Sequence, residues 1–230
     1  MITVLTGFIA GAAHVWSGPD HLAAIAPLAA GTRRRAWLPG TRWGIGHSTG
    51  VILVGILALL FREALPLEAL SGWSERLVGV LLIAIGTWAV LQASRTTVHA
   101  QAHDHDGEAH VHIHAHGSET AHHHTEGAGK PHRHTHAAVG IGLLHGLAGS
   151  AHFLGILPML ALPTRTAAAL YLLAFSLGTI AAMAAFSFFV GITAARCADR
   201  GARLHRGFVT VCGIAAIIVG TFWLATSMRH

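Results

Sequence analysis

The sequence predicts an all-α membrane protein with six transmembrane helices, arranged as two inverted repeats of three helices each. Three observations favour this fold class. Hydrophobic residues make up 53% of the 230 residues and charged residues only 11%, whereas charged residues make up about 25% of a soluble domain. The apolar residues gather in long blocks. The second half of the chain also repeats the pattern of the first.

Six blocks of the chain are apolar, uncharged and long enough to cross a bilayer, which takes roughly 17–25 helical residues. They cover residues 2–19, 43–61, 77–94, 137–164, 166–195 and 207–228. The first block continues past Asp20 and His21 to about residue 30. A cleaved signal peptide is the alternative interpretation of this block, but it lacks a basic start and is too long for a signal-peptide core.

Basic residues predict how these spans are oriented. The segments between spans one and two, three and four, and five and six hold eleven of the 15 Lys and Arg residues. These segments share one side of the membrane, and an excess of Lys and Arg marks the cytoplasmic side. We therefore expect an inner-membrane protein with both termini external. The net charge of +5 reflects this topology, and no nucleic-acid partner is expected.

The two halves of the chain match when one is shifted by 131 residues. Under this shift, residues of the first half fall on identical residues of the second, with Gly11, His14, Gly18, His21, Ile25 and Pro27 matching Gly142, His145, Gly149, His152, Ile156 and Pro158. One further residue of shift pairs Gly46 with Gly178 and His47 with Thr179. Abundant Ala, Gly and Leu can match by chance, but two histidines, two glycines and a proline in register favour a repeat. Three helices per repeat is an odd number, so the halves take opposite orientations, as in transporters with a midplane site.

The apolar blocks contain six polar residues of interest, which are His14, Asp20, His21, His47, His145 and His152. A spacing of seven is close to two helical turns, so His14 and His21 share one helix face. His145 and His152 repeat that spacing. Gly18 and Pro19 lie between the first pair and predict a kink or break. Opened backbone at membrane depth is tolerated only inside protein or beside a wet cavity.

Asp20 inside a membrane costs roughly 2.5–3.5 kcal/mol on insertion scales, and a cation offsets that cost. A single intramembrane histidine can simply hydrogen-bond a neighbouring helix, but five of them with one carboxylate are better explained as a path for a metal ion. Imidazole with carboxylate suits Ni, Co, Zn, Cu or Fe and disfavours Mg and Ca. Met159 and Met183 give only weak support for a Cu(I) thioether path. These residue types shorten the list of candidate metals but do not select one of them.

Three motifs carry a resemblance to a known family. HVWSGPDH (14–21) and WGIGHSTGV (43–51) resemble the nickel/cobalt transporter family, and HGLAGSA (145–151) resembles its short six-helix branch related to urease-accessory nickel permeases. The resemblance implies that Ni(II) or Co(II) is the substrate and that His14, Asp20, His21 and His47 recognise it. This chain has five residues between His14 and Asp20 where better-known members have four. The different spacing implies a different ligand geometry, on which the choice of metal depends.

A histidine-rich segment separates the predicted first repeat (1–94) from the second (137–230). Thirteen of the 20 histidines lie in this segment, residues 95–136, which are His99, His103, His105, His110, His112, His114, His116, His122, His123, His124, His132, His134 and His136. Without apolar periodicity, we expect a disordered cytoplasmic loop. It collects or senses metal, or it is a dispensable buffer. A cytoplasmic metallochaperone is a candidate partner.

These observations favour a non-enzymatic permease that takes up Ni(II) or Co(II) as its substrate, with no prosthetic group. An exporter that relieves metal excess is the alternative, and a membrane metal sensor or assembly factor is a third reading. The sequence holds no GxxxxGK[ST] loop for nucleotide. The register pairs Asp20 with Ala151 and His47 with Thr179. We therefore expect the first repeat to select the ion, with His145 and His152 completing the site or passing the ion onward.

Overall fold

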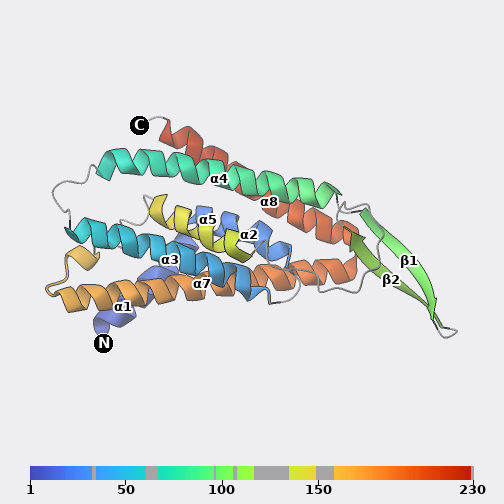
Figure 1. The fold of residues 1–230 in the computed structure, drawn as a ribbon, viewed down its shortest axis with the longest axis horizontal. Helices are drawn as coiled ribbons and strands as arrows, with labels where there is room; N and C mark the ends of the chain where they lie inside the picture. The colour runs from blue at the N-terminus through green and yellow to red at the C-terminus, as the bar shows by residue number, and fades with distance from the viewer. Residues whose placement is uncertain are drawn as a thin grey trace.

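The chain forms an elongated bundle of helices with a β-hairpin at one end (Figure 1). The computed structural model describes residues 1–32, 35–60, 67–95, 97–105, 108–116, 135–148 and 158–228. Both termini lie at the end of the bundle opposite the hairpin.

The bundle itself is helical throughout the described residues, as the apolar blocks predict. Its helices are, in chain order, α1 (Ile2–Ser17), α2 (Pro19–Ala30), α3 (Trp37–Leu60), α4 (Leu67–Arg95), α5 (Thr135–Ala148), α7 (Arg165–Arg200) and α8 (Ala202–Ser227). The first apolar block becomes two helices, α1 and α2, because the chain breaks at Gly18.

The hairpin lies in the histidine-rich segment, where our expectation of disorder is wrong for residues 97–105 and 108–116. Strands β1 (Thr97–His105) and β2 (Glu108–His116) pair antiparallel, with His99 opposite His114 and His103 opposite His110. Histidine alternates with Ala, Val or Ile along β2, and every histidine of β1 lies at an odd-numbered position. Alternation of period two is typical of a strand. In this register the seven histidines of the two strands occupy positions on one face of the hairpin.

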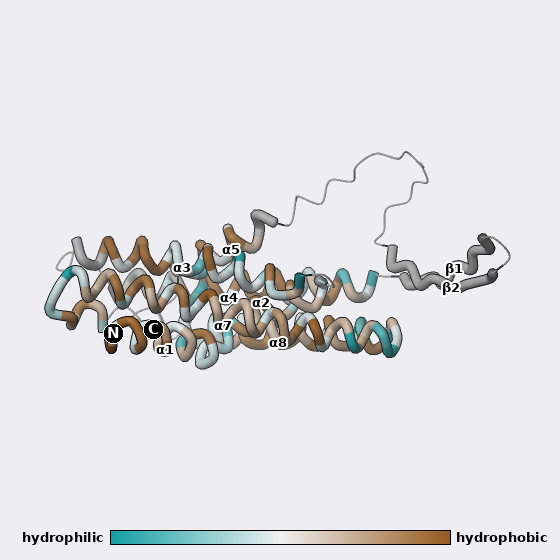
Figure 2. Tube along the Cα trace, turned by 90° about the horizontal axis from the view of Figure 1, so that it is seen from below, coloured by the Kyte–Doolittle hydropathy of each residue, from teal (hydrophilic) through white to brown (hydrophobic). Residues whose placement is uncertain are grey.

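Hydrophobic residues occupy long stretches of the helices (Figure 2), and many of the large ones are exposed. Leu177, Phe189, Ile218 and Phe222 are each more than 60% exposed. Among the described residues, three helical stretches are long and apolar enough to cross a membrane, namely Glu75–Arg95, Arg165–Arg200 and Ala202–Ser227. Ile2–Ser17 and Ala138–Leu147 are apolar but shorter. Large apolar side chains spread over several helices belong in lipid rather than in water, so the chain is a membrane protein.

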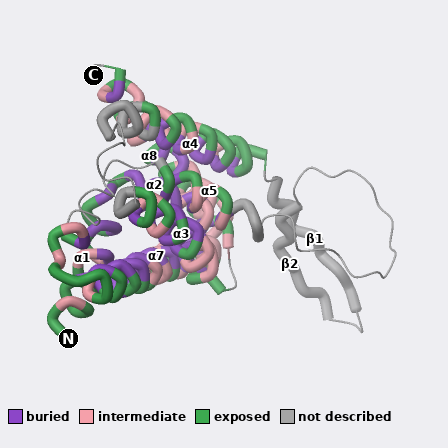
Figure 3. Tube along the Cα trace, turned by 60° about the vertical axis from the view of Figure 1, so that its left-hand side comes forward, coloured by how far each residue is buried: buried purple, intermediate pink, exposed green. Residues whose placement is uncertain are grey.

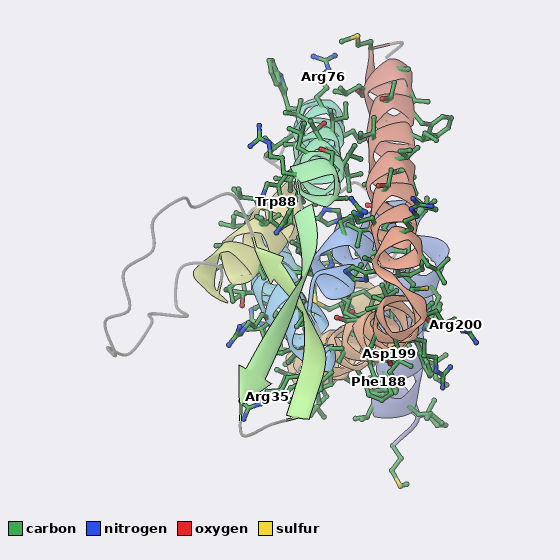
Figure 4. The ribbon with its side chains drawn as sticks, turned by 90° about the vertical axis from the view of Figure 1, so that its right-hand side faces the viewer. Arg35, Arg76, Trp88, Phe188, Asp199 and Arg200 are labelled. Atoms are coloured by element: carbon green, nitrogen blue, oxygen red, sulfur yellow. The ribbon has the colours of Figure 1, made fainter. Side chains whose placement is uncertain are left out.

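Helices α7 and α8 continue past their apolar blocks into a charged end. We expected a loop around Arg196, Arg200, Arg203 and Arg206, but Gly201 alone separates the two helices. Its φ of 140° lies in a region that glycine adopts far more readily than other residues. Figure 4 looks onto this end, with Arg35, Asp199 and Arg200 labelled.

The helices pack in pairs through glycines, with α1 against α7, α3 against α5, and α4 against α8. A Cβ on Gly11 of α1 would overlap the carbonyl oxygen of Phe175, and one on Gly142 of α5 would overlap that of Trp43. In α4, a Cβ on Gly86 would overlap the carbonyl oxygen of Gly213. Small residues allow this close approach between membrane helices. Buried residues accordingly line the inward faces of the helices (Figure 3).

The largest apolar cluster lies where α1, α2, α3, α4, α7 and α8 meet. Its fully buried members include Val15, Ile25, Trp43, Leu82 and Met183. Met159 is buried in a second cluster with Val51 and Phe175. Both mid-helix methionines are therefore core side chains, and the thioether path considered from the sequence gains no support from them.

Gly142→Ala should destabilise the protein by about 1–3 kcal/mol, because the added Cβ overpacks the contact with Trp43. The matched control is Gly140→Ala in the same helix, where an added Cβ meets nothing within 4 Å. Because Ala favours helix more than Gly by about 1 kcal/mol, the control should be neutral or more stable. Thermal unfolding of the detergent-solubilised protein measures both. Equal Tm values would contradict the close helix contact.

Candidate metal centre

The candidate centre is built around the break between α1 and α2. Gly18 is extended (φ −92°, ψ 100°), and Pro19 begins α2 at a position where a missing backbone N–H leaves no helical bond unmade. The N–H of Gly18 donates to the carbonyl oxygen of His14 at 3.1 Å and closes the end of α1. The predicted break at Gly18–Pro19 is confirmed, and it places Asp20 in the first turn of α2.

The break changes how His14 and His21 come together. Residues seven apart in a continuous helix are separated by about 10.5 Å along its axis. In the structure the two ring centroids are only 4.5 Å apart. Both histidines therefore meet because the chain turns between them, and the shared face of an unbroken helix is the wrong explanation for their proximity.

Asp20 connects imidazoles from both halves of the chain. Its Oδ1 lies 3.1 Å from Nδ1 of His21, and its Oδ2 lies 3.1 Å from Nε2 of His145 in α5. The carboxylate is buried, with 4% of the residue exposed. The N-terminus of α2 also favours negative charge at this position through the helix dipole. The carboxylate that the sequence singled out thus has its compensating groups within hydrogen-bond distance.

His47 on α3 completes the cluster of imidazoles. Its ring centroid lies 4.8 Å from that of His21, 5.6 Å from that of His14 and 5.5 Å from that of His145. Gly146 of α5 allows this approach, because a Cβ there would overlap the carbonyl oxygen of His47. His14, His21, His47 and His145 are all buried.

The side chains form two groups whose ligand atoms lie within 4.8 Å of one another. One group is His14, His21 and His47, and the other is Asp20, His21 and His145. Three converging nitrogen or oxygen ligands in a dry site are the donor set of a borderline transition-metal ion. Such a set of ligand atoms could hold a divalent metal ion. Five of the six sequence-predicted site residues are brought together, and His152 lies outside the described residues.

Two aromatic residues beside the centre were missed from the sequence. The Trp43 ring lies 5.8 Å from that of His145, and the Phe175 ring lies 5.5 Å from that of His14. The shift of 132 residues that pairs His47 with Thr179 also pairs Trp43 with Phe175, so the repeat was the signal that could have found them. Thr179 donates through Oγ1 to the carbonyl oxygen of Gly11 at 3.4 Å.

Residues 6–222 match the family model described as the cytochrome C biogenesis protein transmembrane region. Chloroplast protein FOR GROWTH AND FERTILITY 1 of Arabidopsis thaliana is 34% identical over 70% of this chain and 42% of its own length. The chain thus spans less than half the length of that relative.

Two microbial relatives also match this chain. Urease accessory protein UreH of Bacillus sp. (strain TB-90) is 30% identical over 66% of this chain and 60% of its own length. A protein of Methanocaldococcus jannaschii, provisionally named a nickel/cobalt efflux system, is 28% identical over 45% of this chain and 48% of its own length.

No solved structure matches this chain significantly. The family match covers most of the sequence, and the relatives confirm the resemblance inferred from the motifs. The chain belongs to the family of the cytochrome C biogenesis protein transmembrane region, and its relatives include a urease accessory protein and a protein provisionally named a nickel/cobalt efflux system.

Proposed function

We propose that the chain carries Ni(II) or Co(II) across the inner membrane, in the direction of uptake, through the centre formed by His14, Asp20, His21, His47 and His145. His152 is the sixth proposed ligand, on the basis of the sequence repeat. The observation that carries this proposal is a buried carboxylate flanked by imidazoles from both halves of the chain, at a helix break inside an apolar bundle. The imidazole contacts offset part of the cost of burying this charge, and a bound dication would offset more of it.

The donor set supports the class of ion. Imidazole nitrogens with a carboxylate suit borderline divalent metals, whereas Mg²⁺ and Ca²⁺ prefer oxygen ligands. Among the borderline ions, the printed name of the Methanocaldococcus jannaschii relative favours nickel and cobalt. Because the metal is cargo, no resident cofactor and no enzymatic step are proposed.

The proposed architecture is six spans in two inverted repeats, 1–94 and 137–230, joined by the histidine-rich segment. The helix contacts support it. When each residue of a close contact is replaced by the residue that matches it in the other half, under the shifts of 131 and 132 residues, the result is another close contact of the structure. The exchanged pairs are Gly11–Phe175 with Gly142–Trp43, and Gly46–Val139 with Gly178–Phe8. A pseudo-two-fold axis relating the halves accounts for this exchange. Inverted repeats of this kind place the substrate site at the interface between halves.

The proposed topology has both termini external and the hairpin end cytoplasmic. Both termini lie at one end of the bundle (Figure 1), and the labelled basic residues Arg35 and Arg200 lie at the other end (Figure 4). The positive-inside rule then assigns the hairpin end to the cytoplasm. In this orientation the histidine-rich segment meets metal on the cytoplasmic side, where it collects or buffers the ion and where a metallochaperone would dock.

Export is the second candidate, and two observations favour it. One relative is provisionally named an efflux system, and the histidines of β1 and β2 share one face at the proposed cytoplasmic end. Radioactive nickel accumulation by expressing cells separates the two directions. Uptake predicts more nickel in expressing cells at limiting external metal, whereas export predicts less in cells already loaded.

Asp20→Asn should reduce nickel flux into reconstituted vesicles by at least tenfold, because it removes the charge while keeping the shape. A tenfold loss corresponds to about 1.4 kcal/mol, which is modest for a ligand in a dry site. Flux is followed with a metal-sensitive dye inside the vesicles. Asp199→Asn, at an exposed position of α7, is the control and should retain wild-type flux. Equal flux in wild type and Asp20→Asn would contradict the proposed centre.

Selectivity should follow the donor set. A hundredfold excess of Mg²⁺ or Ca²⁺ should leave nickel flux unchanged, because both ions require more oxygen ligands than the centre offers. Equimolar Zn²⁺ or Cu²⁺ should compete, since imidazole suits both ions. Strong inhibition by Mg²⁺ would point to an oxygen-lined path elsewhere in the chain.

Gly18→Ala should weaken nickel binding at least tenfold. Its Cβ would overlap Nδ1 of His21 and lie 2.8 Å from Oδ1 of Asp20, so both ligands must shift. Gly207→Ala is the control, because its Cβ meets nothing within 4 Å. Calorimetric titration with nickel measures both proteins. Unchanged affinity in Gly18→Ala would show that the geometry at the helix break does not set the site.

A further inference from the structure

His21 belongs to both groups of ligand atoms in the centre. His14, His21 and His47 form one three-ligand group, and Asp20, His21 and His145 form the other. His21 is fully buried, so neither of its ring nitrogens is satisfied by bulk water. Which of its two ring nitrogens is available to a metal ion therefore decides which of the two groups can hold that ion.

The two ring nitrogens of His21 have different surroundings. Nδ1 lies 3.1 Å from Oδ1 of Asp20, on the side of the second group. Nε2 has no hydrogen-bond partner among the described residues. A buried ring nitrogen without a partner costs free energy unless a ligand uses it, which makes Nε2 a candidate donor to a metal ion beside His14 and His47.

Neutral imidazole has one lone pair to offer a metal and one N–H to donate. When Nδ1 carries the hydrogen, it donates to Asp20 and leaves Nε2 to ligate with His14 and His47. When Nε2 carries the hydrogen, Nδ1 can ligate with Asp20 and His145. A neutral His21 therefore serves only one of the two groups at a time.

We propose that the centre is two adjoining metal sites that share His21, and that a single ion passes from one to the other as His21 changes the nitrogen it offers. This inference rests on the proposed function. The first site takes its ligands only from α1, α2 and α3, whereas the second takes them from α2 and from α5, which belongs to the other half. The transfer thus moves the ion from ligands of one half onto the interface between halves.

Two partial sites suit conduction better than one complete cage. Each group supplies three protein ligands, which leaves room for water or for the incoming ligand during transfer. An ion that is bound by all five side chains at once would leave slowly, and conduction requires sites weak enough to release their ion. His21 releases the ion between the two sites. A water molecule carried by the ion gives a hydrogen to Nε2 while Asp20 accepts the Nδ1 hydrogen. The hydroxide that forms then takes this hydrogen from Asp20, so no proton is gained or lost in the step.

The test compares His47→Ala, which removes the first site, with His145→Ala, which removes the second. Nickel titration of the solubilised full chain measures stoichiometry and affinity, X-ray absorption identifies the ligands, and vesicle flux measures transport. We expect one ion per chain in the wild type and in each variant. The ion should have a carboxylate ligand in His47→Ala and only imidazole side-chain ligands in His145→Ala. Flux should fall at least tenfold in both.

His21→Ala removes the shared ligand and should weaken binding at least a hundredfold, matching the His47→Ala/His145→Ala double variant. His47→Gln and His145→Gln repeat the comparison with side chains of similar volume, in case a cavity unfolds the alanine variants. Two ions bound to the wild type, loss of binding in both single variants, or wild-type flux in either would overturn the shared-ligand relay. A wild type that neither binds nor moves nickel would overturn the proposed function itself.

Discussion

The centre depends on one constraint, which is that a carboxylate lies inside an apolar bundle and must be compensated there. Asp20 meets this requirement through the N-terminus of α2, Nδ1 of His21 and Nε2 of His145. Each of these partners needs a particular backbone feature. The helix terminus exists because Gly18 and Pro19 interrupt the first apolar block, and His145 arrives on a helix from the other half of the chain.

Close helix packing brings the remaining ligands within reach. Imidazole side chains are short, so rings 4.5–5.6 Å apart require backbones that nearly touch. Gly142 and Gly146 supply this contact between α5 and α3, and they do so on the helix that carries His145. The contacts that stabilise the bundle are therefore the contacts that assemble the centre, and overpacking one of them should disturb both.

The two halves share their packing but differ in their chemistry. Trp43 and Phe175 occupy matching places beside the centre, and matching glycines lie at both helix crossings. At the position of His47, however, the second half has Thr179, whose hydroxyl donates to a backbone carbonyl instead of facing an ion. A second buried carboxylate would add like charge to a dry interior. One carboxylate and unequal ligands therefore fit a site that holds one dication and releases it.

The sequence by itself determined the apolar helices, the break at Gly18–Pro19 and the identity of the polar residues within the bundle. These follow from local chemistry, since lipid demands long apolar helices and proline cannot continue one. The tertiary structure decided which of those polar residues meet. Asp20 and His145 are remote in the chain, and only the packing of α5 against α3 and the turn at Gly18 bring them together. It also decided the hairpin, because strand pairing depends on a partner strand that local composition does not specify.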